Sequence, residues 1–155
     1  MLKTHKKKKI LAISSAGGHW IQLRRLLPAF ERDNIVFVTT RPEYRIEVEP
    51  HSFYAINDAT RWNAFGLLKQ VVRLCYIILR ERPDVVISTG ASCGLFSLFF
   101  GKVLLRAKTI WVDSYANSSE MSLSGKLVAW HADMRLTQWP NVARIGGPHY
   151  RGSVL

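Results

Sequence analysis

The stretch KILAISSAGGHWIQL, residues 9–23, contains an apolar run, a pair of glycines and the start of a helical segment. The run at 9–14 is short and rich in aliphatic residues, which is typical of a buried strand. Gly17 and Gly18 permit a tight turn after it, and a helix is predicted over 19–31. A strand that passes through glycines into a helix is a common opening unit of an α/β sheet.

The same alternation continues along the chain. Further strands are predicted at 35–39, 53–56, 84–88, 109–113 and 135–138, and further helices at 63–82, 93–106 and 122–132. Alternating strands and helices indicate a parallel sheet with helices on both faces, and continuous apolar strands suit a sheet that is buried on both sides. We therefore expect one α/β domain over 9–155, preceded by a basic tail over 1–8.

The chain is strongly basic, with a formal net charge of +11. Lys3 and the run Lys6–Lys9 supply part of this charge, either as a solvated tail or as a contact to an anion. A basic surface suits nucleic acid, anionic lipid or a phosphorylated substrate. Nucleic acid is the least favoured of these, because the sequence has no zinc-finger spacing and no basic motif interleaved with aromatic residues.

Neither a signal peptide nor a membrane-spanning helix is expected. The apolar run at 10–13 is too short for a signal sequence, and Lys102 interrupts the longest apolar stretch, 90–105. The helix predicted at 63–82 carries Phe65, Leu68, Val72, Cys75 and Leu79 at helical spacing, and Lys69, Arg73 and Arg80 on another side. Burial of this apolar stripe in the core is the favoured interpretation, and contact with a membrane surface is the alternative.

Small and hydroxyl-bearing residues follow several of the predicted strands, where ligands bind in open α/β sheets. Glycines at a strand-to-helix turn let backbone N–H groups approach an anion, so the loops are candidates for holding phosphate, although they also suit a tight turn alone. The candidate binding residues are Ser15, Gly17 and Gly18 in the first loop, Thr89, Gly90 and Ser92 in the loop after 84–88, and Ser114 and Asn117 after 109–113.

His19 and Asp113 are the candidate catalytic residues. An imidazole beside a glycine turn suits a general base at neutral pH, although it also suits a helix cap. Asp113 stands at another strand end, where it orients the imidazole, takes the proton itself or caps a turn. No cofactor is expected, because the glycine spacings of dinucleotide and P-loop sites are absent. No metal site is expected either, because the other histidines have no paired spacing with carboxylates or cysteines.

Five stretches together resemble one family: SSAGGHWIQL, RPDVVISTGAS, WVDSYANSSEMSLSGKL, ADMRLTQWP and GPHYRGSVL. They resemble the PssD-type glycosyltransferase subunits of bacterial exopolysaccharide synthesis. They are also similar to the membrane-anchored subunit of the eukaryotic two-part N-acetylglucosaminyltransferase that extends dolichol-diphosphate-GlcNAc. The resemblance implies a Rossmann-like domain, the N-terminal acceptor lobe of a GT-B glycosyltransferase whose donor-binding lobe is a separate partner chain.

Several functional expectations follow from that resemblance. The complex would transfer a sugar from a UDP-sugar to a lipid-diphosphate-linked saccharide at the cytoplasmic face of a membrane, with this chain bound peripherally and active only with its partner. His19 would be the base for the acceptor hydroxyl. Gln138, Trp139 and Pro140 are candidates for the partner interface. The alternative is a non-catalytic membrane adaptor that recruits and activates a partner glycosyltransferase subunit.

Overall fold

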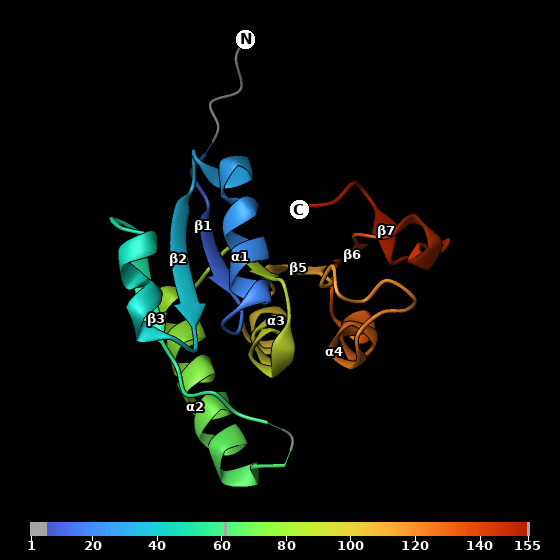
Figure 1. Cartoon of the computed structure of the whole chain (residues 1–155). Coiled ribbons are helices and arrows are strands. Elements are labelled where there is room, and N and C mark those ends of the chain that lie inside the picture. The colour runs from blue at the N-terminus through green and yellow to red at the C-terminus, as the bar shows by residue number, and fades with distance from the viewer. Residues whose placement is uncertain (1–5, 61, 155) are drawn as a thin grey trace.

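A computed structural model describes residues 6–60 and 62–154, and its centre is a parallel sheet of seven strands (Figure 1). The spatial order of the strands is β3-β2-β1-β4-β5-β6-β7, so the first strand of the chain lies inside the sheet. The strands are β1 (Lys9–Ile13), β2 (Asn34–Thr39), β3 (Ser52–Ala55), β4 (Val85–Ser88), β5 (Lys108–Val112), β6 (Met134–Thr137) and β7 (His149–Tyr150).

The helices lie in the connections between these strands. The α-helices are α1 (Gly18–Arg25), α2 (Ala64–Glu81), α3 (Ala91–Leu105) and α4 (Leu123–Leu127). Short 3₁₀ helices are η1 (Leu27–Phe30), η2 (Pro42–Glu47), η3 (Val128–Trp130) and η4 (Pro140–Val142). The parallel α/β sheet predicted from the sequence is confirmed, together with its six predicted strands. The short edge strand β7 was not predicted.

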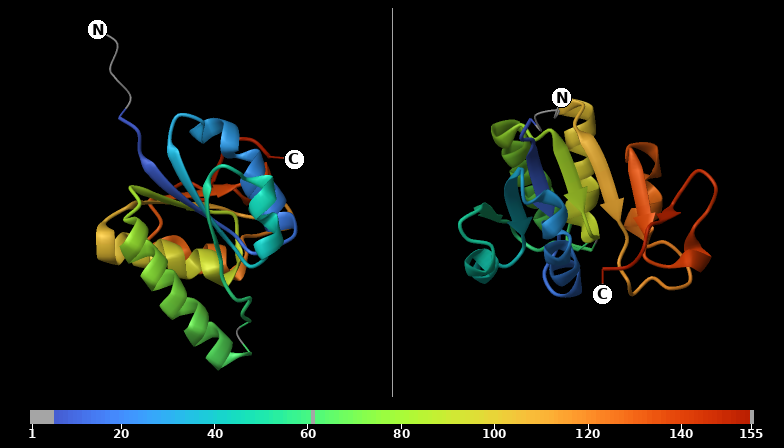
Figure 2. Two further views of the ribbon diagram at one scale, coloured as in Figure 1. Left: turned by 90° about the vertical axis from the view of Figure 1, so that its left-hand side faces the viewer. Right: turned by 90° about the horizontal axis from the view of Figure 1, so that it is seen from above.

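Helices cover both faces of the sheet, and each face has its own hydrophobic core. Side chains of successive strand residues point to opposite faces. On β1, Leu11 and Ile13 pack with the residues of α2 and α3, whereas Ile10 and Ala12 pack with those of α1. Figure 2 shows α2 and α3 on one side of the sheet and α1 on the other. Burial on both faces explains why the central strands are continuously apolar.

Two of the predicted helices are shorter than the sequence suggested. The helix predicted over 19–31 is wrong in length: α1 ends at Arg25, and η1 follows it. Pro28 accounts for this end, because proline lacks an N–H group and its ring clashes with the carbonyl four residues earlier. The helix predicted over 122–132 is also too long, since α4 ends at Leu127 and tightens into η3. The helices predicted at 63–82 and 93–106 are confirmed as α2 and α3.

The favoured interpretation of the stripe on α2 was wrong. Gln70, Leu74 and Ile77 turn toward the sheet and α3, whereas Phe65 is 80% exposed and Val72 is 61% exposed. Both sides of this helix are apolar. One of them packs against the sheet and α3, and the other is exposed to solvent. Lys69 and Arg73 also lie on the exposed side. No helix within residues 6–60 and 62–154 has both the length and the apolar character needed to cross a bilayer.

Candidate functional site

The candidate site lies at the carboxyl ends of β1 and β4, which are neighbours in the sheet. From β1 the chain continues into α1 on one face, and from β4 it continues into α3 on the other. The strand order therefore changes direction between these two strands. In open parallel sheets this is the position at which ligands bind, because the two departing loops leave a crevice between them.

The helices that begin at this point differ from the other two α-helices in how they start. Asn63 caps α2 by accepting a hydrogen bond from the Gly66 N–H, and Ser122 caps α4 through the Gly125 N–H. Among the described residues, no side chain caps the start of α1 or of α3. Both helices begin after a glycine at positive φ, Gly17 and Gly90. Uncapped N–H groups at a helix N-terminus favour binding of an anion.

The loop before α1 is held against the loop after β2. The Ala16 N–H donates to Thr40 Oγ1 at 3.1 Å, and the Gly17 N–H donates to Tyr44 Oη at 3.4 Å. A pocket of about 560 Å³ adjoins this contact and is also lined by Arg41 and by the acidic residue Glu43. The first glycine loop therefore lies beside one cationic side chain that the sequence places directly after β2.

His19 connects the two glycine loops. Its imidazole lies against Gly90, where an added Cβ would be 2.4 Å from His19 Nδ1. Thr89 Oγ1 donates a hydrogen bond of 2.7 Å to the backbone carbonyl of His19. Gly90, with φ of +150°, thus allows the close approach of a side chain from α1 as well as the turn into α3. Two loops about seventy residues apart in sequence form one structure.

The environment of His19 keeps its imidazole neutral. Burial lowers the pKa of His19 below the usual value of 6.5, and the Thr89 backbone and the charge of Asp113 offset only part of this effect. Nδ1 is buried without a hydrogen-bond partner among the described residues. A neutral imidazole is the form that accepts a proton, so the side chain is suited to act as a general base near neutral pH.

Asp113 is buried and its carboxylate is occupied by hydrogen bonds within the chain. It accepts from Trp111 Nε1 at 2.9 Å and from Asn117 Nδ2 at 3.1 Å. It also accepts from both the N–H and the hydroxyl of Ser122, the residue that caps α4. Within the described part of the chain it accepts no hydrogen bond from His19. Its contacts order the loop between β5 and α4, and its role in a reaction stays a prediction.

Gln22 was missed in the sequence, and it forms a buried amide pair with Gln138, which was predicted as an interface residue. Gln138 Nε2 donates to Gln22 Oε1 and, at 2.9 Å, to the Asp113 carbonyl. Gln22 Nε2 donates to Ser114 Oγ, and Gln22 Oε1 accepts the Tyr115 N–H at 3.1 Å. Gln22 follows His19 by three residues, which places both on one side of a helix. That spacing is the signal that would have identified it.

Some of the other predicted residues lie in the glycine loops, and others hold neighbouring elements of the fold together. Ser15 is half-buried in the first glycine loop. The Ser92 hydroxyl faces Gln70 Oε1 at 3.1 Å and the Ala59 carbonyl at 3.3 Å, so it joins α3 to α2. Trp139 Nε1 donates to the Tyr115 carbonyl at 2.7 Å, while Pro140 is exposed. Gln138 is buried, so of the three predicted interface residues only the latter two offer surface to a partner.

The site contains nothing that resembles a metal centre. Across the described residues, no three His, Cys, Asp or Glu side chains are grouped closely enough to hold a metal ion. The groups available for a ligand are the uncapped N–H groups of α1 and α3, the imidazole of His19 and the guanidinium of Arg41. This set can hold an anion and accept a proton.

Comparison with known proteins gives a family match over most of the chain. Residues 54–154 match the family described as oligosaccharide biosynthesis protein Alg14 like. The UDP-N-acetylglucosamine transferase subunit alg14 of Schizosaccharomyces pombe is 32% identical over 89 residues, 53% of this chain and 34% of that protein. The corresponding subunit of Eremothecium gossypii is 33% identical over 78 residues, 47% of this chain and 35% of that protein. The matches thus span about a third of the length of these relatives.

Comparison with solved structures supports the fold. MurG of Acinetobacter baumannii matches with a TM-score of 0.73 at 14% identity, over 94% of this chain and 45% of that one. The Rossmann-like fold expected from the sequence resemblance is therefore confirmed, and this chain corresponds to less than half of the MurG chain.

Proposed function

The chain belongs to the family of Alg14-like oligosaccharide biosynthesis proteins, and on this premise we propose that it is the acceptor-binding subunit of a two-chain glycosyltransferase. The complex transfers a sugar from a UDP-sugar to a saccharide carried on a lipid diphosphate. The observation that carries the proposal is the convergence of two uncapped helix N-termini on the half-buried imidazole of His19. This arrangement offers N–H groups to a diphosphate and a neutral base to a hydroxyl.

The residues have distinct roles in the proposed reaction. The acceptor hydroxyl oxygen forms a bond to the anomeric carbon of the donor sugar, and the bond from that carbon to the nucleoside diphosphate oxygen breaks. His19 takes the hydroxyl proton, and the electron pair of the broken bond leaves with the diphosphate. The loops at Gly17–Gly18 and Gly90 hold the acceptor diphosphate through N–H groups. Ser114 and Asn117 border the acceptor sugar, and Asp113 positions their loop through its hydrogen bonds.

A second chain supplies the binding site for the donor. The resemblance to two-part enzymes supports this division, as do the two relatives that are named as transferase subunits. Half-exposed Trp139 and exposed Pro140 contribute to the surface for that partner. We place the complex at the cytoplasmic face of a membrane, because the acceptor is carried on a lipid. The resemblance to PssD-type subunits favours a bacterial exopolysaccharide as the product.

Sugar transfer to a lipid-diphosphate-linked saccharide tests the function directly. A panel of UDP-sugars, with UDP-N-acetylglucosamine as the first, is incubated with membranes that contain this chain, its donor-binding partner, or both. Transfer is expected only with both chains. Transfer by this chain alone contradicts the division between two subunits, and no transfer with any donor contradicts the proposed reaction.

His19→Ala tests the catalytic assignment in the same assay. Loss of a general base lowers turnover by roughly a hundredfold to ten-thousandfold, whereas assembly with the partner is unchanged. His51→Ala is the control, because this exposed histidine lies between η2 and β3, away from the glycine loops. Equal turnover for both variants would remove His19 from the reaction.

A non-catalytic adaptor is the second candidate. It is favoured by the number of predicted site residues whose polar groups are already paired within the chain, above all Asp113 and Ser92. An adaptor would recruit and activate the partner subunit, and the glycine loops would serve folding. It predicts full transfer activity for His19→Ala whenever the complex still assembles.

A further inference from the structure

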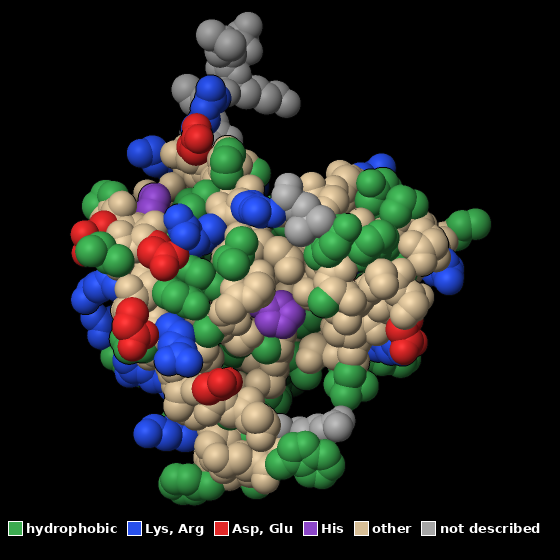
Figure 3. Space-filling view, in the orientation of Figure 1, with side chains coloured by type: hydrophobic (Ala, Val, Ile, Leu, Met, Phe, Trp, Pro, Cys, Tyr) green, Lys and Arg blue, Asp and Glu red, His purple; other side chains and the backbone are tan. Residues whose placement is uncertain are grey.

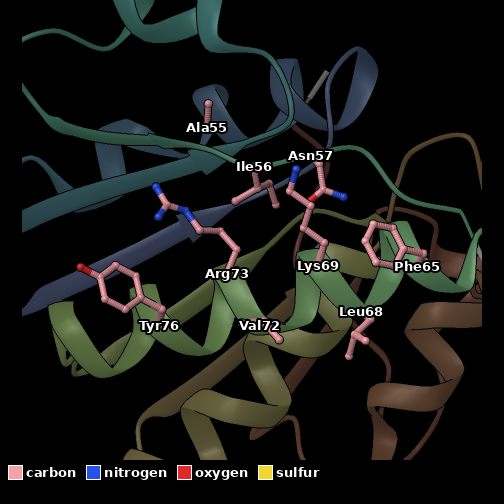
Figure 4. Close-up of a pocket in the computed structure, with 9 residues that line it drawn as sticks. All are labelled: Ala55, Ile56, Asn57, Phe65, Leu68, Lys69, Val72, Arg73 and Tyr76. Carbon is pink, nitrogen blue, oxygen red and sulfur yellow. The ribbon is translucent and has the colours of Figure 1, made fainter.

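A groove runs between α2 and the segment that follows β3. It has a volume of about 760 Å³ and is lined by Ala55, Ile56, Asn57, Phe65, Leu68, Lys69, Val72, Arg73 and Tyr76. Figure 4 shows Lys69 and Arg73 extending from α2 toward the segment Ala55–Asn57, whereas Leu68 and Val72 lie on the side of the helix away from it. The cations and the apolar side chains therefore occupy adjoining parts of the exposed surface of α2.

The exposed side of α2 has large hydrophobic residues along its whole length. Leu68 is 60% exposed, and hydrophobic side chains project at the lower end of the molecule in Figure 3. Phe65, Leu68, Val72, Tyr76 and Leu79 follow one another at spacings of three or four residues, so they form a stripe on a helix. We call this stripe, together with Lys69 and Arg73, the α2 face.

The charges of the α2 face have no acidic counterpart on the helix surface. Glu81 is the one acidic residue of α2, and it is engaged by Tyr54 and Lys9. Arg73 lies 5.7 Å from the centre of the Tyr76 ring, and Arg80 donates to Tyr76 Oη. Within the described residues, no carboxylate pairs with Lys69 or Arg73. Asp58 is the nearest acid in the preceding loop, and it is exposed.

We propose that the α2 face binds an anionic phospholipid leaflet, with its apolar stripe at the level of the headgroups and with Lys69 and Arg73 on lipid phosphates. A helix with a strongly apolar face, flanking cations and aromatic residues is the usual form of an interfacial helix. Lysine and arginine keep their charged ends in the polar layer while their stems cover apolar surface. The net charge of +11 adds long-range attraction to the same leaflet.

The composition of the α2 face favours lipid over a protein partner. Interface cores between proteins are depleted in lysine, and a charge buried there without a partner is costly. Lys69 and Arg73 both line the groove, so a protein seated in it would have to supply carboxylates at those two positions. A leaflet supplies phosphates at any position, which fits two cations that pair with no carboxylate in the described part of the chain.

This inference rests on the proposed function, because it gives the lipid-linked acceptor its route to the site. Gln70 is on the buried side of α2, and its Oε1 lies 3.1 Å from the hydroxyl of Ser92 at the start of α3. Gln70 Nε2 also donates to the Asn57 carbonyl at 2.8 Å, at the end of the groove. A leaflet on the α2 face would thus present a lipid diphosphate beside the second glycine loop.

Vesicle sedimentation tests the proposal with the 155-residue chain. The vesicles are phosphatidylcholine, with or without a fixed fraction of phosphatidylglycerol. Leu68→Gln/Val72→Gln removes apolar surface, and its control is Ile46→Gln/Ile145→Gln, two aliphatic residues that are at least as exposed elsewhere. Lys69→Gln/Arg73→Gln removes two charges, and its control is Arg32→Gln/Arg151→Gln, which has the same net charge. Thermal unfolding confirms that each variant is folded.

The expected result is binding to anionic vesicles that falls about tenfold or more in both α2-face variants and less than about threefold in both controls. Equal losses in the charge variant and its control would overturn the proposal, because any surface cation would then serve. Binding of the unaltered chain to pure phosphatidylcholine vesicles that equals its binding to the anionic vesicles would overturn the proposal as well. A dimer that Leu68→Gln/Val72→Gln dissociates, without vesicle binding, would assign the α2 face to a second copy of the chain.

Sugar transfer to a short-chain, water-soluble acceptor separates this inference from the proposed function. That reaction needs no membrane, so the two-chain complex should retain it in both α2-face variants. Absence of transfer with the unaltered chain contradicts the proposed function, whatever the vesicles show. If the unaltered chain retains transfer but does not bind vesicles, lipid binding by the α2 face is contradicted and the proposed function is not.

Discussion

The imidazole of His19 lies so close to Gly90 that a methyl group at position 90 would be 2.4 Å from its Nδ1 atom. The contact joins the starts of α1 and α3, which lie on opposite faces of the sheet. Gly90 is a candidate phosphate-binding residue from the sequence. It thus also determines where the imidazole of His19 can lie. Activity and backbone conformation are therefore coupled at this position.

Gly90→Ala is expected to lower the transfer rate of the two-chain complex by about a hundredfold, because a displaced base loses its alignment with the acceptor. The φ of +150° at position 90 adds a strain of about 1–3 kcal/mol to the folded state. Gly146→Ala is the matched control, since Gly146 also has a positive φ, of +84°, but has open space around it. Turnover and thermal unfolding are measured for both. An active Gly90→Ala enzyme would show that His19 does not need this position.

The pH dependence of transfer follows from the environment of His19. Burial lowers the pKa of His19 from 6.5, so the neutral base persists to lower pH than a free imidazole would. The value of kcat/KM should therefore fall on acidification with a midpoint below 6.5, and it should be flat just above that pH. The measurement is a pH profile with soluble acceptor. The residual activity of His19→Gln should not show this fall at low pH. If the fall is unchanged in that variant, it is caused by the titration of another group.

Asp113→Asn separates a positioning role from a direct role in the reaction. The amide supplies fewer acceptor positions for the donors on Trp111, Asn117 and Ser122. We expect the free energy of unfolding to fall by about 3 kcal/mol in urea denaturation. Glu120→Gln, at an exposed and solvent-screened ion pair, should leave it nearly unchanged. An Asp113→Asn chain with unchanged stability and no activity would support direct participation instead.

Gln138→Leu tests the buried amide pair. It removes the acceptor of the Val154 N–H and the side-chain donor to the Asp113 carbonyl, and it leaves Gln22 Oε1 with the Tyr115 N–H as its donor. The free energy of unfolding should fall by about 1–3 kcal/mol. Amide exchange at Val154 should accelerate, because the C-terminal segment is attached through this side chain and through Arg25. Unchanged exchange at Val154 would show that the contact to Arg25 suffices.

The sheet could be predicted because its strands are short, apolar and separated by helix-length segments. Val85, Val86 and Ile87 are buried on both faces, and such runs carry a clear signal. β7 carried none, because His149 and Tyr150 are exposed at the end of the sheet. The exposed side of α2 could not be chosen from the sequence, since both sides are apolar and the choice depends on how the helix packs against α3.

The candidate site could be predicted in its parts and not in its connections. The residues after β1 and β4 were identifiable because carboxyl ends of parallel strands meet at one edge. The contact of His19 with Gly90 joins positions far apart in the chain, and the pairing of Gln22 with Gln138 spans 116 residues. Local pattern carries no information on such pairs. The network of Asp113 is local in sequence, from Trp111 to Ser122, but it depends on the conformation of the loop between β5 and α4, which the sequence pattern does not give.

The hydrogen bond between Ser92 and Gln70 has a geometric consequence. It joins the start of α3 to the middle of α2, so the second glycine loop is tied directly to the helix that carries the α2 face. The fold thereby sets the height of that loop above any surface on which α2 rests. A saccharide chain anchored in that surface would meet the imidazole of His19 at one set distance from its anchor, and the protein would measure acceptor length without contacting every sugar.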